Sequence, residues 1–419
     1  MATPSIALIP TGTKAGTLYS VLPEDGSGDF TVVRATTATR VNENGLIESV
    51  ANNVPRLDYT NGGCPVLLTE PQSTQLITYP LSFDNAYWTK DGTTVVSGQT
   101  SPSADSPTGA FKLVEDTSGG HHRMYASING VSKTFSIYAK YIDVQYLGIS
   151  YDGGTNFSFF DILNGQLGTL ADSAHTSVIT YLSNGWYRCS VYNNDSSFGT
   201  LVALSKDGIT TSYVGDGTSG AYIFGTQLEA LSYPTSLMLP LTEGSTTTRN
   251  ADQVTDSGDV NDFNSTEGVL MLEMSRLNKS DTSSIITSIN DGSLTNTIAL
   301  YYNSGGIAYD ILNSAGERSG SFSMSTNNQS NLNKIALKYK SQDISLFVNG
   351  FEVDTNVGTL SLSGLNTLEL NHGNGAFNFY GKTKQIQVFK SALTSLEIET
   401  LTSWTSFILM ANAQEYLVY

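Results

Sequence analysis

Short apolar runs that alternate with polar residues at every second position recur along most of this chain. In residues 134–140, for example, Phe135 and Ile137 flank the polar Ser136. A period of two is the repeat of a half-buried β-strand. Turn residues divide these runs at the spacing that is typical of a sandwich or barrel. The sequence therefore predicts an all-β protein with two β-sandwich domains, of the jelly-roll or lectin-like kind, preceded by an extended N-terminal docking segment.

The composition agrees with this fold class and excludes some functions. Charged residues make up 14% of the chain, against roughly 25% in average soluble proteins, and its 22 Tyr and 17 Phe favour pleated surfaces. The formal net charge of −17 argues against nucleic acid as a partner. Nothing reaches the length of a membrane span or resembles a signal peptide, so we expect no membrane insertion and synthesis in a cytoplasm.

The two cysteines are too few for a disulfide framework. Cys64 and Cys189 both have apolar or aromatic neighbours in the sequence. We therefore expect two buried free thiols in preference to a bridge between them.

Composition and turn signals divide the chain into five parts. The N-terminal part is poor in large apolar residues, and the C-terminal part is strongly apolar. The predicted parts are an N-terminal virion-docking segment at 1–72, a jelly roll at 73–245, a Ser/Thr-rich linker at 246–256, a second sandwich at 257–403 and a C-terminal tail at 404–419.

The second sandwich has the clearest local signals. Ile335, Leu337 and Tyr339 alternate with Ala336 and Lys338, which predicts one buried and one exposed face for that strand. Its predicted strands are 268–274, 284–289, 297–302, 334–339, 344–348, 367–370 and 385–389.

Two further signals mark the ends of elements. Asn349-Gly350 predicts a hairpin turn. Thr394 and Glu397 stand at the spacing of a capping box and predict a short helix over residues 394–403.

Three stretches of the N-terminal part resemble a signature of bacteriophage virion proteins. They are DFTVVRATTATR at 29–40, PRLDY at 55–59 and LLTEPQ at 67–72. The opening ALIPTG at 7–12 and YSVLP at 19–23 look like the version found in phages of Bacteroidetes hosts, including crAss-like phages. The boundaries of the next domain, FDNAYWTK at 83–90 and GTQLE at 225–229, are similar to those of carbohydrate-binding-like jelly rolls. ISLFVNG at 344–350 and IQVF at 386–389 resemble a laminin-G or concanavalin-A-like domain.

The resemblance implies a structural subunit of a virion surface fibre, on the head or the tail, that is not an enzyme. Such fibres are usually homotrimers, and their sandwiches adhere to glycans of the host surface. A polysaccharide depolymerase is the alternative. The extended N-terminal chain, rich in proline, is suited to a groove of a capsid or tail protein. We expect its apolar residues to make that contact: Ile6, Leu8, Ile9, Tyr19 and Leu22.

Aromatic residues are the first candidates for glycan binding, since sugar rings stack on aromatic planes. Tyr87 and Trp88 are the predicted stacking residues, while the similar pair Trp186 and Tyr187 is better explained as core. His122 and Arg123 belong to the most conspicuous polar cluster, His121-His122-Arg123. A contact with sugar is one interpretation of His122 and Arg123, and plain surface exposure is the other.

No catalytic constellation is identified. Asp143, Asp152 and Asp161 lie near strand ends but lack the paired pattern of a glycosidase. No cofactor is predicted, and adjacent histidines on a strand point to opposite faces, which disfavours a shared metal.

Calcium remains an open alternative, because lectin-like sandwiches hold it through loop oxygens. Asp281, Asn290 and Asp291 are the candidate ligands. The other explanation for these residues is that they form turns.

Overall fold

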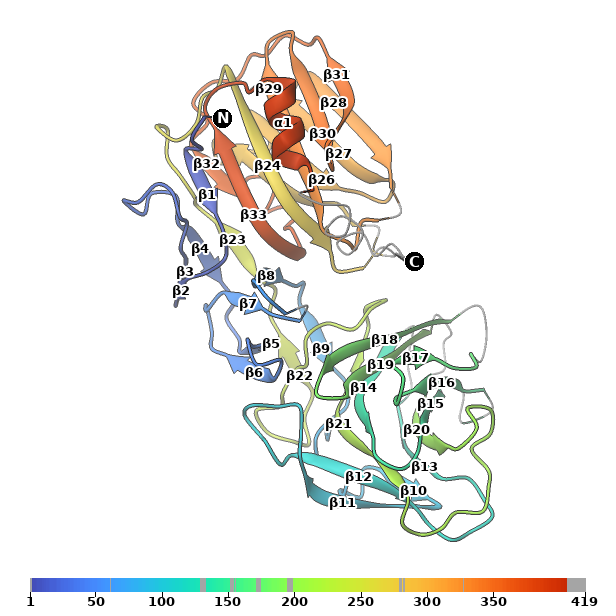
Figure 1. Ribbon diagram of the computed structural model, residues 1–419. Coiled ribbons are helices and arrows are strands. Elements are labelled where there is room, and N and C mark those ends of the chain that lie inside the picture. The colour runs from blue at the N-terminus through green and yellow to red at the C-terminus, as the bar shows by residue number, and fades with distance from the viewer. Residues whose placement is uncertain are drawn as a thin grey trace.

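A computed structural model describes residues 2–60, 62–128, 133–150, 154, 156–170, 175–193, 199–278, 281, 283–326 and 328–404. Within these ranges the chain forms antiparallel β-sheets arranged as two sandwiches, which confirms the predicted fold class (Figure 1). The predicted tail lies outside the described residues, apart from Trp404. None of the described helices is long and apolar enough to cross a membrane.

The first sandwich consists of two sheets that enclose one apolar core. The core includes Phe135 and Ile137, as their alternation predicted. In the described chain, one sheet has the order β10 (Thr89–Asp91), β13 (Arg123–Ser127), β20 (Gly199–Ser205), β15 (Tyr146–Ser150), β16 (Ser158–Asp161) and β17 (Gln166–Leu167). The other has the order β11 (Thr93–Gln99), β12 (Ala110–Glu115), β21 (Gly220–Glu229), β14 (Lys133–Tyr141), β19 (Trp186–Asn193) and β18 (Thr176–Ser183).

The second sandwich has a larger and a smaller sheet. The larger has the order β31 (Phe351–Asn356), β30 (Ile344–Val348), β29 (Asn333–Lys340), β24 (Glu267–Arg276), β33 (Gly381–Phe389), β8 (Val66–Thr69) and β7 (Arg56–Asp58), with β1 (Ile6–Leu8) also paired to β33. The smaller has the order β28 (Arg318–Ser325), β27 (Gly306–Leu312), β26 (Thr297–Tyr302), β25 (Ile285–Asn290) and β32 (Thr367–Glu369).

A helix covers the outer face of the larger sheet. Helix α1 (Ser395–Thr402) begins at the predicted capping box of Thr394 and Glu397, and its Ile398 packs with Ala336 and Phe347. The prediction that β29 has one exposed face was therefore wrong. Ala336 lies beneath α1, and Lys338 is buried with its ammonium 2.6 Å from Asp343. The predicted hairpin at Asn349-Gly350 is confirmed, with both residues at positive φ as a tight hairpin turn requires.

The N-terminal part is threaded through the rest of the chain (Figure 1). Ile6 and Leu8 are fully buried in the core of the second sandwich, about 380 positions away along the sequence, because β1 pairs with β33. Its strands β7 and β8 also belong to the larger sheet, and the others form two small sheets: β2 (Thr13–Lys14), β3 (Thr17–Leu18) and β4 (Phe30–Val33) with β23 (Gln253–Thr255) of the predicted linker, and β5 (Ala38–Val41) with β6 (Ile47–Val50). A further small sheet pairs β9 (Ser73–Gln75), at the start of the predicted jelly roll, with β22 (Thr247–Arg249) of the linker.

This threading corrects part of the predicted docking contact of the N-terminal segment. Ile6 and Leu8 are core residues of their own chain, so their side chains are not available for docking. Ile9 and Tyr19 are 45% and 40% exposed, and Leu22 is half-buried. A docking role for these three remains a prediction.

Candidate functional site

The outer face of the smaller sheet of the second sandwich carries the chain's most promising group of surface side chains. Alternate residues of β26 and β27, such as Leu300 and Tyr309, point into the core. The residues between them therefore face outward, and Tyr301 and Asp310 stand there beside Ala299 and Ala308. The two alanines are buried, so the larger side chains around them form the surface of this face.

Asp310 organises the polar part of this face. Its Oδ2 accepts a hydrogen bond of 2.9 Å from the Tyr301 hydroxyl, and its Oδ1 lies 3.2 Å from Nε of Arg318. Burial, followed by the charge of Asp310, raises the pKa of Tyr301. The hydroxyl therefore stays protonated and can donate. Arg318 is 63% exposed and leaves most of its guanidinium donors free to meet a ligand.

The loop that follows β32 carries an aromatic residue and a histidine and returns beside β25 of the same sheet. Phe377 is 56% exposed, and its backbone carbonyl accepts a hydrogen bond from the Ile286 amide of β25. Its φ of 52° is unfavourable for a residue with a bulky side chain. Such strain is found preferentially at functional sites.

His372 lies beside Phe377, with 6.3 Å between the ring centroids. Burial lowers the pKa of His372, and the charge of Asp310 partly opposes that effect. At neutral pH the imidazole is therefore neutral and has one donor and one acceptor nitrogen. We call Tyr301, Asp310, Arg318, His372 and Phe377 the Phe377 face.

Next to this face, a cavity of about 310 Å³ opens between the two sandwiches. Phe377, Asn378 and Tyr380 line it from the second sandwich, and Leu231 and Tyr233 line it from the end of the first. The Oδ1 atom of Asn378 is buried and has no hydrogen-bond partner among the described residues. An extended ligand lying on Phe377 would therefore have further polar and aromatic contacts within reach.

Sequence reasoning missed the Phe377 face. The strands β27 and β28, which carry Asp310 and Arg318, are absent from the strands predicted for the second sandwich. The alternation of Ile307, Tyr309 and Ile311 was the signal that could have identified β27.

The two predicted stacking residues lie mainly inside the first sandwich. Trp88 is 1% exposed, belongs to the core and donates its Nε1 hydrogen to the Tyr79 carbonyl at 2.9 Å. Stacking on a sugar is thus excluded for Trp88 in this conformation. Tyr87 is half-buried against Trp88 and Tyr79, and a glycan contact by its exposed edge remains a prediction. Trp186 is a core residue, as expected.

His122 and Arg123 of the polar cluster differ in burial. His122 is fully buried, with Nδ1 2.7 Å from the Gly92 carbonyl and Nε2 3.0 Å from that of Tyr213. Neither interpretation of His122, sugar contact or surface exposure, agrees with this burial. Arg123 is partly exposed and pairs with Asp91 at 2.8 Å. Its role in glycan binding remains a prediction.

The candidate calcium ligands are occupied by local turns. Asp291 accepts hydrogen bonds from Ser293 and Asn296, Asp281 accepts one from Ser283, and Asn290 is fully buried. In the described part of the chain, no three His, Cys, Asp or Glu side chains gather as a metal site would require.

The other residues singled out for chemistry have mostly structural surroundings. Asp143 pairs with Lys112, Asp161 accepts hydrogen bonds from Gln145 and Asn164, and Asp152 lies outside the described residues. Cys189 is buried as predicted, but Cys64 is exposed, so the prediction of a buried thiol was wrong there.

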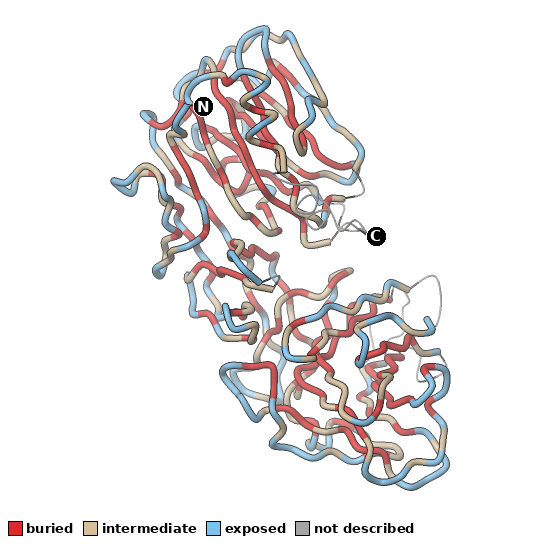
Figure 2. The backbone as a smooth tube through the Cα atoms, viewed as in Figure 1, coloured by how far each residue is buried: buried red, intermediate tan, exposed pale blue. Residues whose placement is uncertain are grey.

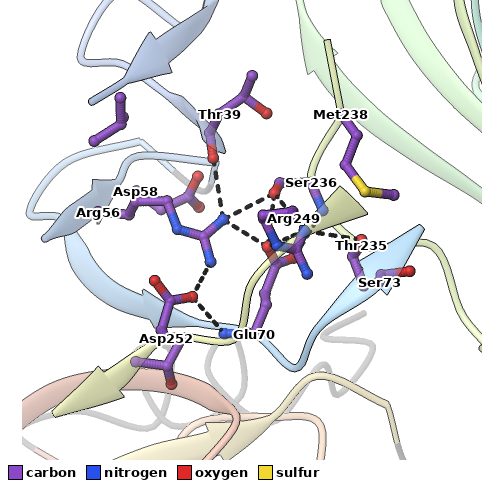
Figure 3. Close-up of polar contacts among 12 residues, drawn as sticks. Thr39, Arg56, Asp58, Glu70, Ser73, Thr235, Ser236, Met238, Arg249 and Asp252 are labelled. Atoms are coloured by element: carbon purple, nitrogen blue, oxygen red, sulfur yellow. Dashed lines mark hydrogen bonds and ion pairs between the residues drawn. The ribbon is translucent and has the colours of Figure 1, made fainter. Parts of the chain in front are cut away.

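A buried network of charged side chains joins the N-terminal part, the first sandwich and the predicted linker (Figure 3). Arg56 pairs with Glu70 at 2.5 Å and with Asp252, Arg34 pairs with Asp252 at 2.9 Å, and Arg249 pairs with Glu70 at 2.9 Å. All five side chains are at most 3% exposed. We call these five residues the junction network.

The junction network also reaches the end of the first sandwich. Ser236 donates both its amide and its hydroxyl to Glu70, and Arg249 contacts Thr235 at 3.0 Å. The predicted linker is therefore an ordered element of the junction, with Arg249 and Asp252 almost completely buried.

The comparison with known protein families agrees with the fold of the second sandwich. Residues 271–399 match the family model of the concanavalin A-like lectin/glucanases superfamily. No curated protein sequence matches the chain.

Several solved structures show local similarity at low scores. The CBM40 module of the Ruminococcus gnavus IT-sialidase, bound to α2,3-sialyllactose, is 20% identical, with 33% of this chain and 84% of that chain covered and a TM-score of 0.29. Domain 4 of the arabinanase AbnA from Geobacillus stearothermophilus, in complex with arabinotriose, is 11% identical, with coverages of 36% and 73% and a TM-score of 0.29. The NanB sialidase of Streptococcus pneumoniae is 16% identical, with coverages of 34% and 25% and a TM-score of 0.29.

Proposed function

We propose that this protein is a glycan-binding surface protein that uses the Phe377 face of its second sandwich to hold carbohydrate without cleaving it. The observation that carries the proposal is the exposed Phe377 ring, 6.3 Å from the His372 ring, on the sheet that also carries the group formed by Tyr301, Asp310 and Arg318. An aromatic plane accepts the C–H face of a sugar ring, while the carboxylate and guanidinium meet its hydroxyls. The match of this domain to a lectin and glucanase superfamily supports the same ligand class.

The finer part of the proposal concerns where the protein works. The resemblance of residues 29–40, 55–59 and 67–72 to phage virion proteins supports a subunit of a virion surface fibre, on the head or the tail. In that setting we expect a homotrimer, attached to other virion proteins through the N-terminal part and exposed on the particle. Several copies would raise the avidity for a host glycan without any new contact.

The test is a glycan array probed with the full chain, followed by titration of the best ligand. Phe377→Ala should weaken binding about ten-fold, and Arg318→Ala by roughly as much, since an aromatic or charge-assisted contact contributes about 1–2 kcal/mol. Both side chains are more than half exposed, so the thermal stability of the variants should stay near that of the wild type.

Phe351→Ala is the matched control. Phe351 is 73% exposed but lies on β31 of the other sheet, so its loss should leave binding unchanged. Equal binding by the wild type and by Phe377→Ala and Arg318→Ala would contradict the site. Release of oligosaccharides from a bound polysaccharide would contradict the non-catalytic role and favour a depolymerase.

A further inference from the structure

A second cavity, of about 280 Å³, lies at the junction of the two sandwiches and is separate from the Phe377 face. Its walls come from three parts of the chain: Asp58 from the N-terminal part, Tyr138, Tyr181 and Arg188 from the first sandwich, and Lys382 from the second. A cavity of this size is slightly smaller than the usual range for drug-sized ligands, roughly 300–1,000 Å³, and therefore suits one small ring.

The charges along the wall do not balance. Arg40 pairs with Glu48, and Glu70 is neutralised by Arg56 and Arg249. For Arg188 and Lys382 the described residues provide no carboxylate within ion-pair distance, and Asp58 likewise has no cation partner there. Two unmatched cations and one unmatched carboxylate leave a single positive charge, which one anionic group of a ligand would neutralise.

The positions of these groups are fixed by the fold. Arg188 donates to the Thr235 carbonyl at 2.6 Å and to Ser136, and its guanidinium lies 5.3 Å from the centre of the Tyr138 ring. These contacts leave two of its five N–H groups unused. Asp58 is 5% exposed and is held by the Val41 amide and by Thr60.

The remaining wall is suited to hydroxyl groups and an apolar ring face. The phenol hydroxyls of Tyr138, Tyr181 and Tyr233 make no hydrogen bond to any part of the chain that the structure describes. Burial raises the pKa of Tyr138 and Tyr233, so both remain donors at neutral pH. Tyr181 is 55% exposed and stands edge-on to Tyr187, where its ring is free to stack.

We propose that this junction cavity binds a single sugar ring that carries one carboxylate, of the uronic acid class. The carboxylate would pair with Lys382 and Arg188, the hydroxyls would meet Asp58 and the tyrosine hydroxyls, and the ring would stack on Tyr181. A sugar phosphate fits less well, because its charge of about −1.5 to −2 at neutral pH exceeds the single unmatched positive charge.

The experiment is calorimetric titration of the full chain with glucuronate, glucose, acetate and glucose 6-phosphate at low salt. Glucuronate should bind at least ten-fold more tightly than each of the other three. Lys382→Gln should remove most of that preference, and Tyr181→Ala should weaken glucuronate and glucose together. Lys384→Gln, a partly exposed lysine on the same strand β33 that does not line the cavity, is the matched control and should bind as the wild type does.

Glucuronate binding no tighter than that of glucose would overturn the proposal, as would unchanged binding in both Lys382→Gln and Tyr181→Ala. Equal binding of acetate would show a carboxylate site without sugar recognition and would also overturn it. Phe377→Ala should leave glucuronate binding intact. The experiments therefore distinguish a loss of glycan binding at the Phe377 face from a loss of glucuronate binding in the junction cavity.

Discussion

Arg56 and Asp252 lie 196 positions apart in the sequence and form an ion pair in which their side chains are 0% and 2% exposed. The pair connects the N-terminal part to the chain between the two sandwiches, and Arg56 contacts Glu70 as well (Figure 3). Buried residues fill both sandwiches and also occur in the segments between them (Figure 2). The two sandwiches are therefore joined by a packed, charged junction.

Removing Arg56 should destabilise this junction strongly. Arg56→Met leaves Glu70 and Asp252 with one cation fewer in a buried site, and we expect a loss of about 3–5 kcal/mol in the free energy of unfolding. Denaturant unfolding followed by circular dichroism measures this. Arg40→Gln, which breaks the partly exposed pair with Glu48, is the control and should cost less than about 1 kcal/mol. Equal effects of the two variants would contradict a special role for the junction network.

The junction should also be sensitive to acid. Burial alone would raise the pKa of Glu70, but Arg249 and Arg56 outweigh it and hold the pKa well below its usual value. A carboxylate whose pKa is lower in the folded state stabilises the fold above its unfolded pKa, and that stabilisation is lost as the pH falls below about 4.5. Unfolding measured between pH 3 and pH 7 should show a shallower pH dependence in Glu70→Gln than in the wild type. Identical slopes would contradict this account of Glu70.

The first strand should stabilise the second sandwich. Leu8 is fully buried between the sheets of that sandwich, so Leu8→Ala should cost roughly 2–5 kcal/mol. Ile9→Ala changes the neighbouring residue, which is 45% exposed, and should cost much less. Hydrogen exchange of β33 reports the effect at its partner strand. Unchanged protection of β33 in Leu8→Ala would show that β1 is dispensable.

Because of His372, the fold should be less stable in mild acid than at neutral pH. Burial lowers the pKa of His372 in the folded state, so the unfolded chain binds the proton more readily. The neutral imidazole therefore stabilises the fold above the unfolded pKa of about 6.5, and this stabilisation declines as the pH falls below that value. His372→Gln should flatten the change in thermal stability between pH 7.5 and pH 5.5. A wild-type profile that is flat across this range would contradict the prediction.

Most strands and the helix could be predicted from local pattern, while the junction and the site could not. The period-two runs gave β14, β26 and β30 nearly to the residue, and the Thr394–Glu397 spacing gave the start of α1. A local sequence pattern predicts which residues are buried, but it does not predict which distant element packs against them. The outer face of β29 was therefore predicted to be exposed, although α1 packs on it.

The residues that carry the resemblance to virion proteins have a structural role that their spacing does not reveal. Arg34, Arg56 and Glu70 fall in the three quoted stretches, and all three meet in the junction network. Their partners Arg249 and Asp252 lie about 180–220 positions further along, in a segment predicted to be a linker. A pairing over that distance leaves no periodic signal in a single sequence.

The central claim is that the Phe377 face binds carbohydrate, and a crystal structure of the full chain with the best glycan from the array tests it most directly. The account predicts a sugar ring stacked on Phe377, with hydroxyls within hydrogen-bond distance of Asp310 and Arg318 and the glycan chain intact. A glycan bound elsewhere, with the Phe377 face empty at saturating ligand, would contradict the account.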